Sequence, residues 1–281
     1  CEAMAKALNG LRLSGTVVIG ERLPNTPLSK GCVVGTGGDV EVDLAVDPLD
    51  GIESVAFGKT NAISVAAMTE KGTLFEAPTR YMNKLAVGPQ AAGRIDIAAS
   101  PLDNLVNIAE AKRTYVEDLT VCILERERHA PLIEQVRSAG ARIRLIPHGD
   151  IAAAIATAVP GSGIDVLMGV GGANEGVLAA VALRCVGGDI QGQLHPQSDS
   201  DVKAIEESSV GSRDKVLSIE ELCGKAHLMF AATGVNNSEI LNGVRFCQGG
   251  AATHSLVLRS RSGTIRFVQT SHTFDREPDY S

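Results

Sequence analysis

The chain has 281 residues, a formal net charge of −7, 44% hydrophobic residues and 21% charged residues. It is long enough for one large domain or two smaller ones, and these proportions exclude a disordered chain. Aromatic residues make up only 3% and tryptophan is absent, which argues against a surface that stacks nucleic-acid bases. No Lys/Arg cluster or membrane-length apolar run (roughly 18–20 residues) occurs. We therefore expect no nucleic acid among the partners and no membrane span.

The six cysteines are Cys1, Cys32, Cys122, Cys185, Cys223 and Cys247. They are widely spaced, with no C-x-x-C pair and no histidine at the spacing of a zinc site. This pattern predicts reduced thiols in the core of a protein from a reducing compartment, the cytoplasm or a plastid stroma. No signal peptide is recognisable at the start of the sequence.

Short apolar runs broken by Gly, Pro and Asp characterise the first part of the chain. We predict strands at Thr16–Ile19, Val42–Val46 and Ala62–Met68. Pro101–Lys112 has the period of a helix, with Leu102, Leu105, Ile108 and Ala109 on one face.

Strands and helices alternate in the second part. The predicted strands are Leu119–Leu124, Arg142–Ile146, Asp165–Val170, Leu228–Ala232, Ser255–Arg259 and Thr264–Gln269. The predicted helices are Pro131–Ala139, Asp150–Val159, Asn174–Val186 and Ser238–Asn242. The polar segment Leu194–Ser218 is predicted as a surface loop. This alternation is typical of α/β proteins. We predict two domains: residues 1–117, an α/β domain carrying the carboxylate motif below, and residues 118–281, a doubly wound α/β domain with C-terminal strands.

Two carboxylates follow an apolar run at Val42–Gly51. The run predicts a strand that ends in Asp47, where Pro48 stops sheet pairing because it has no N–H. Asp50 and Gly51 then form a tight turn. Oxygen ligands placed in this way suit Mg²⁺, which binds through one or two carboxylates and substrate phosphates. A plain turn sequence is the alternative interpretation.

Several motifs resemble one protein family. Asp43–Gly51 is similar to the D-x-A-V-D-P-[IL]-[ED]-G-T signature of class II fructose-1,6-bisphosphatases, in the branch that also hydrolyses sedoheptulose-1,7-bisphosphate. Further similar motifs follow in the family's order: Gly15–Glu21, Ala77–Met82, Arg128 with His129, Gly149–Ala153, Gly169–Gly176 and Phe230–Val235. The resemblance implies the sugar phosphatase fold, layered α/β/α/β/α, and hydrolysis of a C1 phosphate in carbohydrate metabolism, in gluconeogenesis or the Calvin cycle.

The resemblance also implies roles for eight residues. Glu21, Asp47, Asp50 and Glu175 fall on positions that bind Mg²⁺ or Mn²⁺ in the family. Tyr81, Arg126, Arg128 and Asp150 fall at or near positions that hold the sugar bisphosphate. Other interpretations stay open, because Glu175 also suits the first turn of a helix, Glu21 suits a solvated strand end, and residues 125–128 alternate in charge like a solvated surface.

Four departures from the family pattern bear on activity. The family's upstream Lys and Asp have no counterpart in Cys1–Ser14, and Arg22-Leu23 stands where the family has a second Gly-Glu. Asp50 is shorter than the Glu that is common at that position. Ile52 occupies the position of a threonine whose hydroxyl helps to activate water, and positioned proton transfer is worth about 10²–10⁴ in rate.

Three interpretations of function follow. The chain is a metal-dependent sugar-bisphosphate phosphatase, or a catalytically impaired homologue serving as a structural or binding subunit of a larger assembly, or a sensor that binds sugar phosphate without turnover. We also expect a homo-oligomer or membership of a larger complex.

Overall fold

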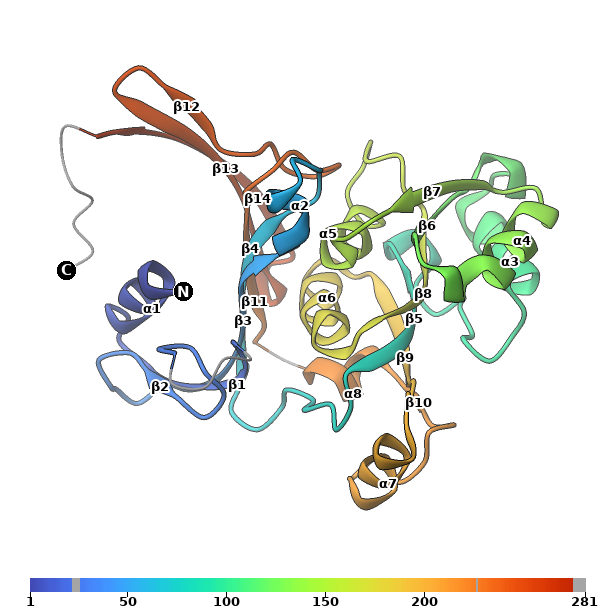
Figure 1. The fold of residues 1–281 in the computed structure, drawn as a ribbon, viewed down its shortest axis with the longest axis horizontal. Coiled ribbons are helices and arrows are strands. Elements are labelled where there is room, and N and C mark those ends of the chain that lie inside the picture. The colour runs from blue at the N-terminus through green and yellow to red at the C-terminus, as the bar shows by residue number, and fades with distance from the viewer. Residues whose placement is uncertain (22–25, 226, 275–281) are drawn as a thin grey trace.

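The computed structural model describes residues 1–21, 26–225 and 227–274. They form five layers in the order helix, sheet, helix, sheet, helix (Figure 1). Helix α1 (Glu2–Asn9) lies on the outer face of one sheet, and α3 (Pro101–Lys112) and α4 (Ala130–Ser138) lie on the outer face of the other. The layered α/β fold predicted from the sequence is confirmed.

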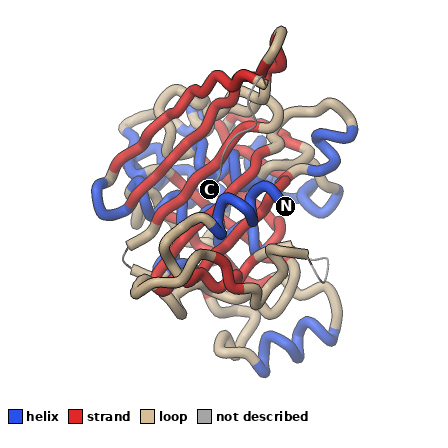
Figure 2. Tube along the Cα trace, turned by 90° about the vertical axis from the view of Figure 1, so that its left-hand side faces the viewer, coloured by secondary structure: helices blue, strands red, loops and turns tan. Residues whose placement is uncertain are grey.

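The first sheet has eight strands in the described residues, in the order β12-β13-β11-β4-β3-β1-β2, with β14 paired to β13. Its strands are β1 (Ser14–Ile19), β2 (Val33–Val34), β3 (Glu41–Asp50), β4 (Ile63–Glu70), β11 (Met229–Gly234), β12 (Arg245–Cys247), β13 (Gly250–Arg259) and β14 (Thr264–Thr273). Figure 2 shows its long strands running side by side across the molecule. Residues 260–263 connect β13 to β14, which pair antiparallel as a hairpin.

The second sheet has six strands in the described ranges, in the order β10-β9-β5-β8-β6-β7. Its strands are β5 (Tyr81–Val87), β6 (Thr120–Leu124), β7 (Arg142–Ile146), β8 (Val166–Gly172), β9 (Asp189–Leu194) and β10 (Val216–Leu217). Strand β6 is parallel to β7 and β8, as the strand–helix alternation predicts, whereas β5 is antiparallel to β8 and β9.

The middle layer explains the alanine content of the chain. Every residue of α5 (Asp150–Ala156) is buried, as are most residues of α6 (Ala173–Val186). A helix enclosed on all sides must be apolar on all sides, and alanine lets it approach both sheets closely. The largest core cluster accordingly combines these helices with residues of both sheets.

Four sequence predictions need correction. Leu194–Ser218 is not a simple loop, because it contains α7 (Asp199–Glu207) and β10. Ser238–Asn242 is irregular, with a bend at Glu239 and Ile240, and is not a helix. Strand β3 does not end at Asp47 but continues through Pro48 to Asp50. Leu102 is half-exposed and leaves the predicted apolar face of α3. Strands β5 and β9 were not predicted. Arg22 and Leu23 lie outside the described residues.

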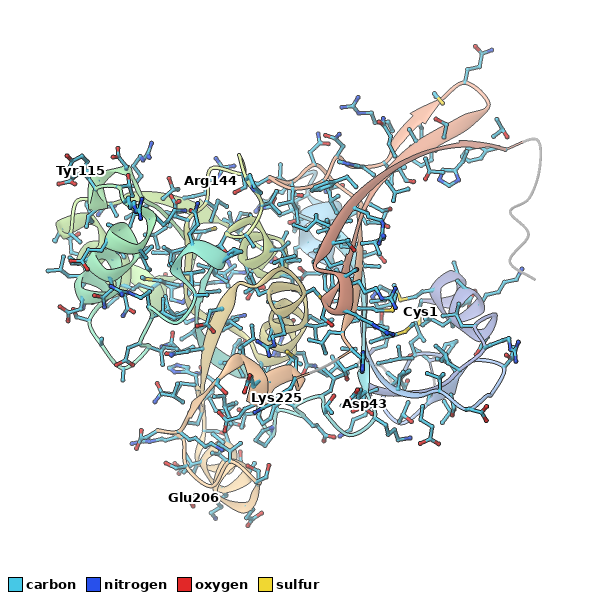
Figure 3. The ribbon with its side chains drawn as sticks, turned by 180° about the vertical axis from the view of Figure 1, so that it is seen from behind. Cys1, Asp43, Tyr115, Arg144, Glu206 and Lys225 are labelled. Atoms are coloured by element: carbon cyan, nitrogen blue, oxygen red, sulfur yellow. The ribbon has the colours of Figure 1, made fainter. Side chains whose placement is uncertain are left out.

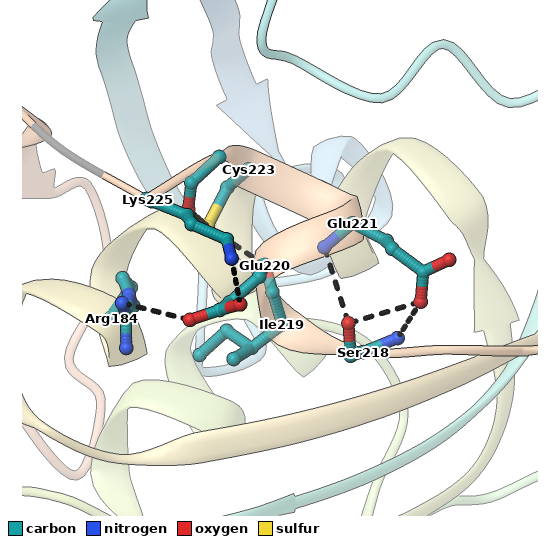
Figure 4. A network of polar contacts seen from close by, with 8 residues as sticks. Arg184, Ser218, Ile219, Glu220, Glu221, Cys223 and Lys225 are labelled. Carbon is teal, nitrogen blue, oxygen red and sulfur yellow. Dashed lines mark hydrogen bonds and ion pairs between the residues drawn. The ribbon is translucent and has the colours of Figure 1, made fainter.

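Local hydrogen bonds and ion pairs hold the helix that follows residue 218. Helix α8 (Ile219–Cys223) begins with a capping box, in which Glu221 N donates to Ser218 Oγ and Ser218 N donates to Glu221 Oε2, at 3.3 and 2.9 Å (Figure 4). Glu220 pairs with Arg184 of α6 and with Lys225. These contacts fasten α8 to the middle layer.

The two-domain division at residue 117 stays a prediction. Each sheet takes strands from both sides of that boundary, because β11 pairs with β4 and β5 pairs with β8 and β9. Helix α7, which carries Glu206, stands apart below the sheets (Figure 3). Within the described ranges, no helix combines the length and apolarity that crossing a membrane requires.

Candidate active site

A cavity of about 550 Å³ opens where the ends of β1, β3 and β5 meet the segments before α5 and α6. All eight predicted site residues line it: Glu21, Asp47, Asp50, Tyr81, Arg126, Arg128, Asp150 and Glu175. Ile52, Glu53 and His148 also line the cavity. The structure therefore brings together residues that are up to 154 positions apart in the chain.

An irregularity at the end of β3 places its two carboxylates. Asp47 pairs with Val65 and Asp50 pairs with Ile63, so three steps along β3 oppose two along β4. Such bulges redirect side chains and are frequent beside active sites. Asp47 Oδ1 also accepts a hydrogen bond of 3.0 Å from Leu49 N, which orders the turn around Pro48.

Asp50 is the most perturbed acid of the cavity. Its side chain is buried, and among the described residues its Oδ2 has no hydrogen-bond partner. Burial raises the pKa of Asp50 well above its ordinary value, and the charges of Asp150, Asp47 and Glu175 raise it further, against a lowering effect of Lys84. A carboxylate in this position needs positive charge.

Two glycines let the acids approach the backbone. A Cβ on Gly172 would lie 1.7 Å from Glu175 Oε2, and a Cβ on Gly171 would lie 2.2 Å from Asp150 Oδ2. Any side chain at these positions would displace a carboxylate. The glycine turn before α6 is therefore part of the site and not only a connection.

Lys84 is a functional-site residue that the sequence did not indicate. Its Nζ forms a buried ion pair with Asp150 Oδ2 and donates a hydrogen bond of 3.0 Å to Gly172 O. Lys84 lies in the middle of β5, a strand that was not predicted, and its partners are 66 and 88 residues away. The ion pair with Lys84 therefore compensates the buried charge of Asp150 and fixes the position of its carboxylate.

An aromatic and basic group forms the opposite wall. The guanidinium carbons of Arg80 and Arg128 each lie 5.4 Å from the centroid of the Tyr81 ring. Arg128 also donates a hydrogen bond of 2.9 Å to Val170 O, which leaves other donors of its guanidinium for a phosphate. Arg128 is exposed enough to meet a ligand, and the stacking limits its movement.

Arg126 is committed to the backbone. It donates to Glu125 O at 2.8 Å and to Pro147 O at 2.7 Å. These bonds tie the end of β6 to the end of β7, so Arg126 has fewer donors available for a phosphate than Arg128.

His129 has a structural position. Its Nδ1 bonds to Leu124 O at 2.7 Å and its Nε2 accepts from Val170 N at 2.8 Å, so the proton is on Nδ1. Burial, first of all, lowers the pKa of His129, and the charges of Arg128 and Arg126 add to this. The imidazole joins β6 to β8 beneath the arginines.

Comparison with known proteins identifies the relatives. Residues 1–272 match the family model described as bacterial fructose-1,6-bisphosphatase, glpX-encoded. This chain belongs to that family. The chain is 40% identical over 305 aligned positions to the D-fructose 1,6-bisphosphatase class 2/sedoheptulose 1,7-bisphosphatase of Microcystis aeruginosa, covering 99% of this chain and 88% of that protein. Proteins of the same name from two Synechococcus strains are 41% identical, over 98% of this chain and 86% of theirs.

The fructose-bisphosphatase family expected from the motifs is thus confirmed. Its members named above act on sugar bisphosphates by name, and this family member retains a cavity lined by six carboxylates and three arginines. Ile52 projects at its rim with 68% of its surface exposed and offers no hydrogen-bonding group to the cavity.

The carboxylates of this family member fit a divalent cation in part. Among the described residues, no group of three or more His, Cys, Asp or Glu side chains converges closely enough to hold a metal ion alone. However, Mg²⁺ commonly takes only one or two protein carboxylates and completes its shell with substrate phosphates and water. A bound cation would give the buried Oδ2 of Asp50 a partner. It would also reduce the repulsion between Asp50 and the neighbouring acids Asp47, Asp150 and Glu175.

Proposed function

We propose that the chain hydrolyses the C1 phosphate of sugar bisphosphates. The proposed substrates are fructose-1,6-bisphosphate and sedoheptulose-1,7-bisphosphate. The observation that supports this most strongly is the meeting of all eight predicted residues in one cavity. The relatives that bear both substrates in their names cover nearly the whole chain.

In this proposal Asp47, Asp50 and Glu175 hold Mg²⁺ or Mn²⁺, with Glu21 at the edge of the site. A cation held there would supply positive charge for the phosphoryl group and would acidify water. Asp50 gains most from the cation, because its charge is buried among other acids.

Arg128 and Tyr81 bind the sugar bisphosphate. Arg128 presents its free N–H groups to a phosphate, and its stack on Tyr81 keeps the guanidinium in one orientation. Asp150, fixed by Lys84, accepts a hydrogen bond from a sugar hydroxyl. Arg126 supports this wall through its backbone contacts.

An impaired homologue that binds without turnover is the second candidate. The observation that favours it is Ile52, an apolar side chain on the rim of a site that must activate water. The two candidates predict different results for the same assay.

The assay measures phosphate release from both bisphosphates by the native chain and its Ile52→Thr variant, with Mg²⁺ or Mn²⁺ and with EDTA. We expect cation-dependent release by the native chain, and a change of less than about tenfold in the variant. Release that occurs only in the variant would instead establish the impaired homologue.

We also propose that the chain forms a homo-oligomer through β14. This strand is hydrogen-bonded to β13, and it exposes Ile265, Phe267 and Val268. Exposed apolar strands at a sheet edge pair readily with another copy. Light scattering coupled to gel filtration should show a dimer or larger species, and Phe267→Lys should shift it toward the monomer.

A further inference from the structure

Two side chains of the cavity, His148 and Glu53, have no role in the proposal above, and they are linked to each other and to Arg126. His148 Nε2 lies 2.9 Å from Glu53 Oε2, and His148 Nδ1 lies 3.4 Å from a terminal nitrogen of Arg126. His148 is the only imidazole among the residues that line the cavity in the described part of the chain. It follows β7, whereas Glu53 is in the first turn of α2 (Ile52–Ala56).

The contacts define where the proton of His148 lies. A guanidinium only donates hydrogen bonds, so Nδ1 facing Arg126 is the accepting nitrogen. Nε2 therefore carries the proton and donates it to Glu53. The bonds from Arg126 to Glu125 O and Pro147 O keep the guanidinium in place. Arg126 therefore orients His148, and His148 orients Glu53; we call this the order of support.

Glu53 differs from the other acids of the cavity. Of the six carboxylates that line it, Asp150 is paired with Lys84, and four are assigned to the cation. Glu53 is 67% exposed, and its Oε1 makes no hydrogen bond to a described residue. One oxygen is therefore held by an imidazole while the other is open to water. A base oriented by a second group, which is itself oriented by a third, is the arrangement that proton-transfer sites use.

We propose that Glu53 is the base that takes a proton from the attacking water, and that His148 and Arg126 position its carboxylate. The proposal rests on the proposed function. The water oxygen forms a bond to phosphorus as Glu53 takes one of its protons. The bond from phosphorus to the C1 oxygen breaks, and this oxygen leaves with the electron pair and is protonated by solvent. Glu53 then returns its proton to water.

The position of Glu53 also bears on Ile52, its neighbour in the chain. An isoleucine cannot orient or deprotonate water, but it can keep other water away from one side of the carboxylate. In this proposal the group that acts on the attacking water is Glu53, which lines the cavity, and not the residue at position 52, where the family has a threonine.

Steady-state kinetics of phosphate release test the proposal with Glu53→Gln. We expect kcat to fall by about 10²–10⁴ while KM changes by less than about threefold. The matched control is Glu134→Gln on α4, whose side chain is 68% exposed and lies outside the cavity. It should retain native kinetics.

His148 is tested by its replacements. His148→Gln keeps an N–H that can reach Glu53, whereas His148→Leu has none. We expect a loss of about tenfold to hundredfold in kcat for the leucine variant, the range found when an orienting partner is lost, and partial recovery for the glutamine variant. Equal losses in both would show that His148 does not act by donating to Glu53.

A measurement without substrate gives an independent check. The ¹⁵N shifts of the histidine rings should show that the proton of His148 is on Nε2, with a change on Glu53→Gln. A proton on Nδ1 would contradict the proposed order of support.

The outcomes separate this inference from the proposed function. Native turnover that persists in Glu53→Gln would overturn the role of Glu53 and leave the phosphatase activity standing. If the native chain releases no phosphate, both fall. If kcat falls in Glu53→Gln by about 10²–10⁴ with little change in KM, while Glu134→Gln behaves as native, both stand.

Discussion

Asp50 should oppose folding in the absence of a cation. Its carboxylate is buried, has an unpartnered oxygen among the described residues, and is surrounded by Asp47, Asp150 and Glu175. Leaving a buried charged or polar group unsatisfied costs about 1–3 kcal/mol. Asp50→Asn keeps the shape and removes the charge. We therefore expect the variant to be more stable than the native chain by about 1–3 kcal/mol without metal.

Thermal unfolding at pH 8 in EDTA measures this difference. For a chain of this size, 1 kcal/mol corresponds to about 2–4 °C, so the melting temperature should rise by about 2–12 °C. With Mg²⁺ or Mn²⁺ the order should change, because a cation that binds only the folded state stabilises it by mass action. The native chain should gain stability on adding cation, and Asp50→Asn should gain much less.

Asp43→Asn is the matched control, because Asp43 is a buried aspartate of the same strand. Its Oδ2 accepts hydrogen bonds from the backbone N–H groups of Gly72, Thr73 and Leu74, at 2.8, 3.1 and 3.3 Å. Its substitution should destabilise the chain, by about 1–3 kcal/mol. If Asp50→Asn were destabilising to the same extent, or if cation stabilised it as much as the native chain, the assignment of Asp50 to a cation site would be refuted.

Three further results are expected. Lys84→Met should lower the free energy of unfolding, measured in urea, by about 3–5 kcal/mol, because it leaves Asp150 buried without its partner. Adding Asp150→Leu should recover most of the loss, and no recovery would mean that the two residues are not coupled. The pKa of His129 is lowered in the folded state, so the unfolded chain binds this proton more tightly. The free energy of unfolding should therefore fall as the pH drops below about 6.5, and it should fall less in His129→Asn. An equal loss of stability in the native chain and the variant between pH 7.5 and 5.5 would contradict this. Thiol titration should show rapid reaction only at exposed cysteines, because burial raises the pKa of the Cys122, Cys185 and Cys223 thiols to about 12. Labelling of these three cysteines in the native state would contradict the fold.

Periodicity was sufficient for the elements with strong local signals. Pro101–Lys112 is a helix with its predicted bounds, because Ser100 caps it, Pro101 starts it, and Leu105, Ile108 and Ala109 form a buried face. Strands β6, β7 and β8 and helix α6 were likewise predicted close to their bounds. In contrast, β5 contains Asn83 and Lys84, whose polar side chains conceal a buried strand from any apolar pattern.

The candidate site was predictable where a motif named its residues. Glu175 could be assigned to the same site as Asp47 and Asp50 only through the family resemblance, because no local pattern links the end of β3 to the first turn of α6. Lys84 could not be found in this way, since its role depends on the long-range contacts with Asp150 and Gly172. The pair of Glu53 and His148 also depends on tertiary structure: the two are 95 positions apart, and neither stands out in the sequence.

Phosphorus NMR of fructose-1,6-bisphosphate, incubated with the native chain in excess and Mg²⁺ or Mn²⁺, tests the central claim most directly. The C1 phosphate signal should disappear as inorganic phosphate appears, the C6 signal should remain, and EDTA should prevent the change. Persistence of both sugar phosphate signals in the presence of cation would contradict the claim that this cavity is a working phosphatase site.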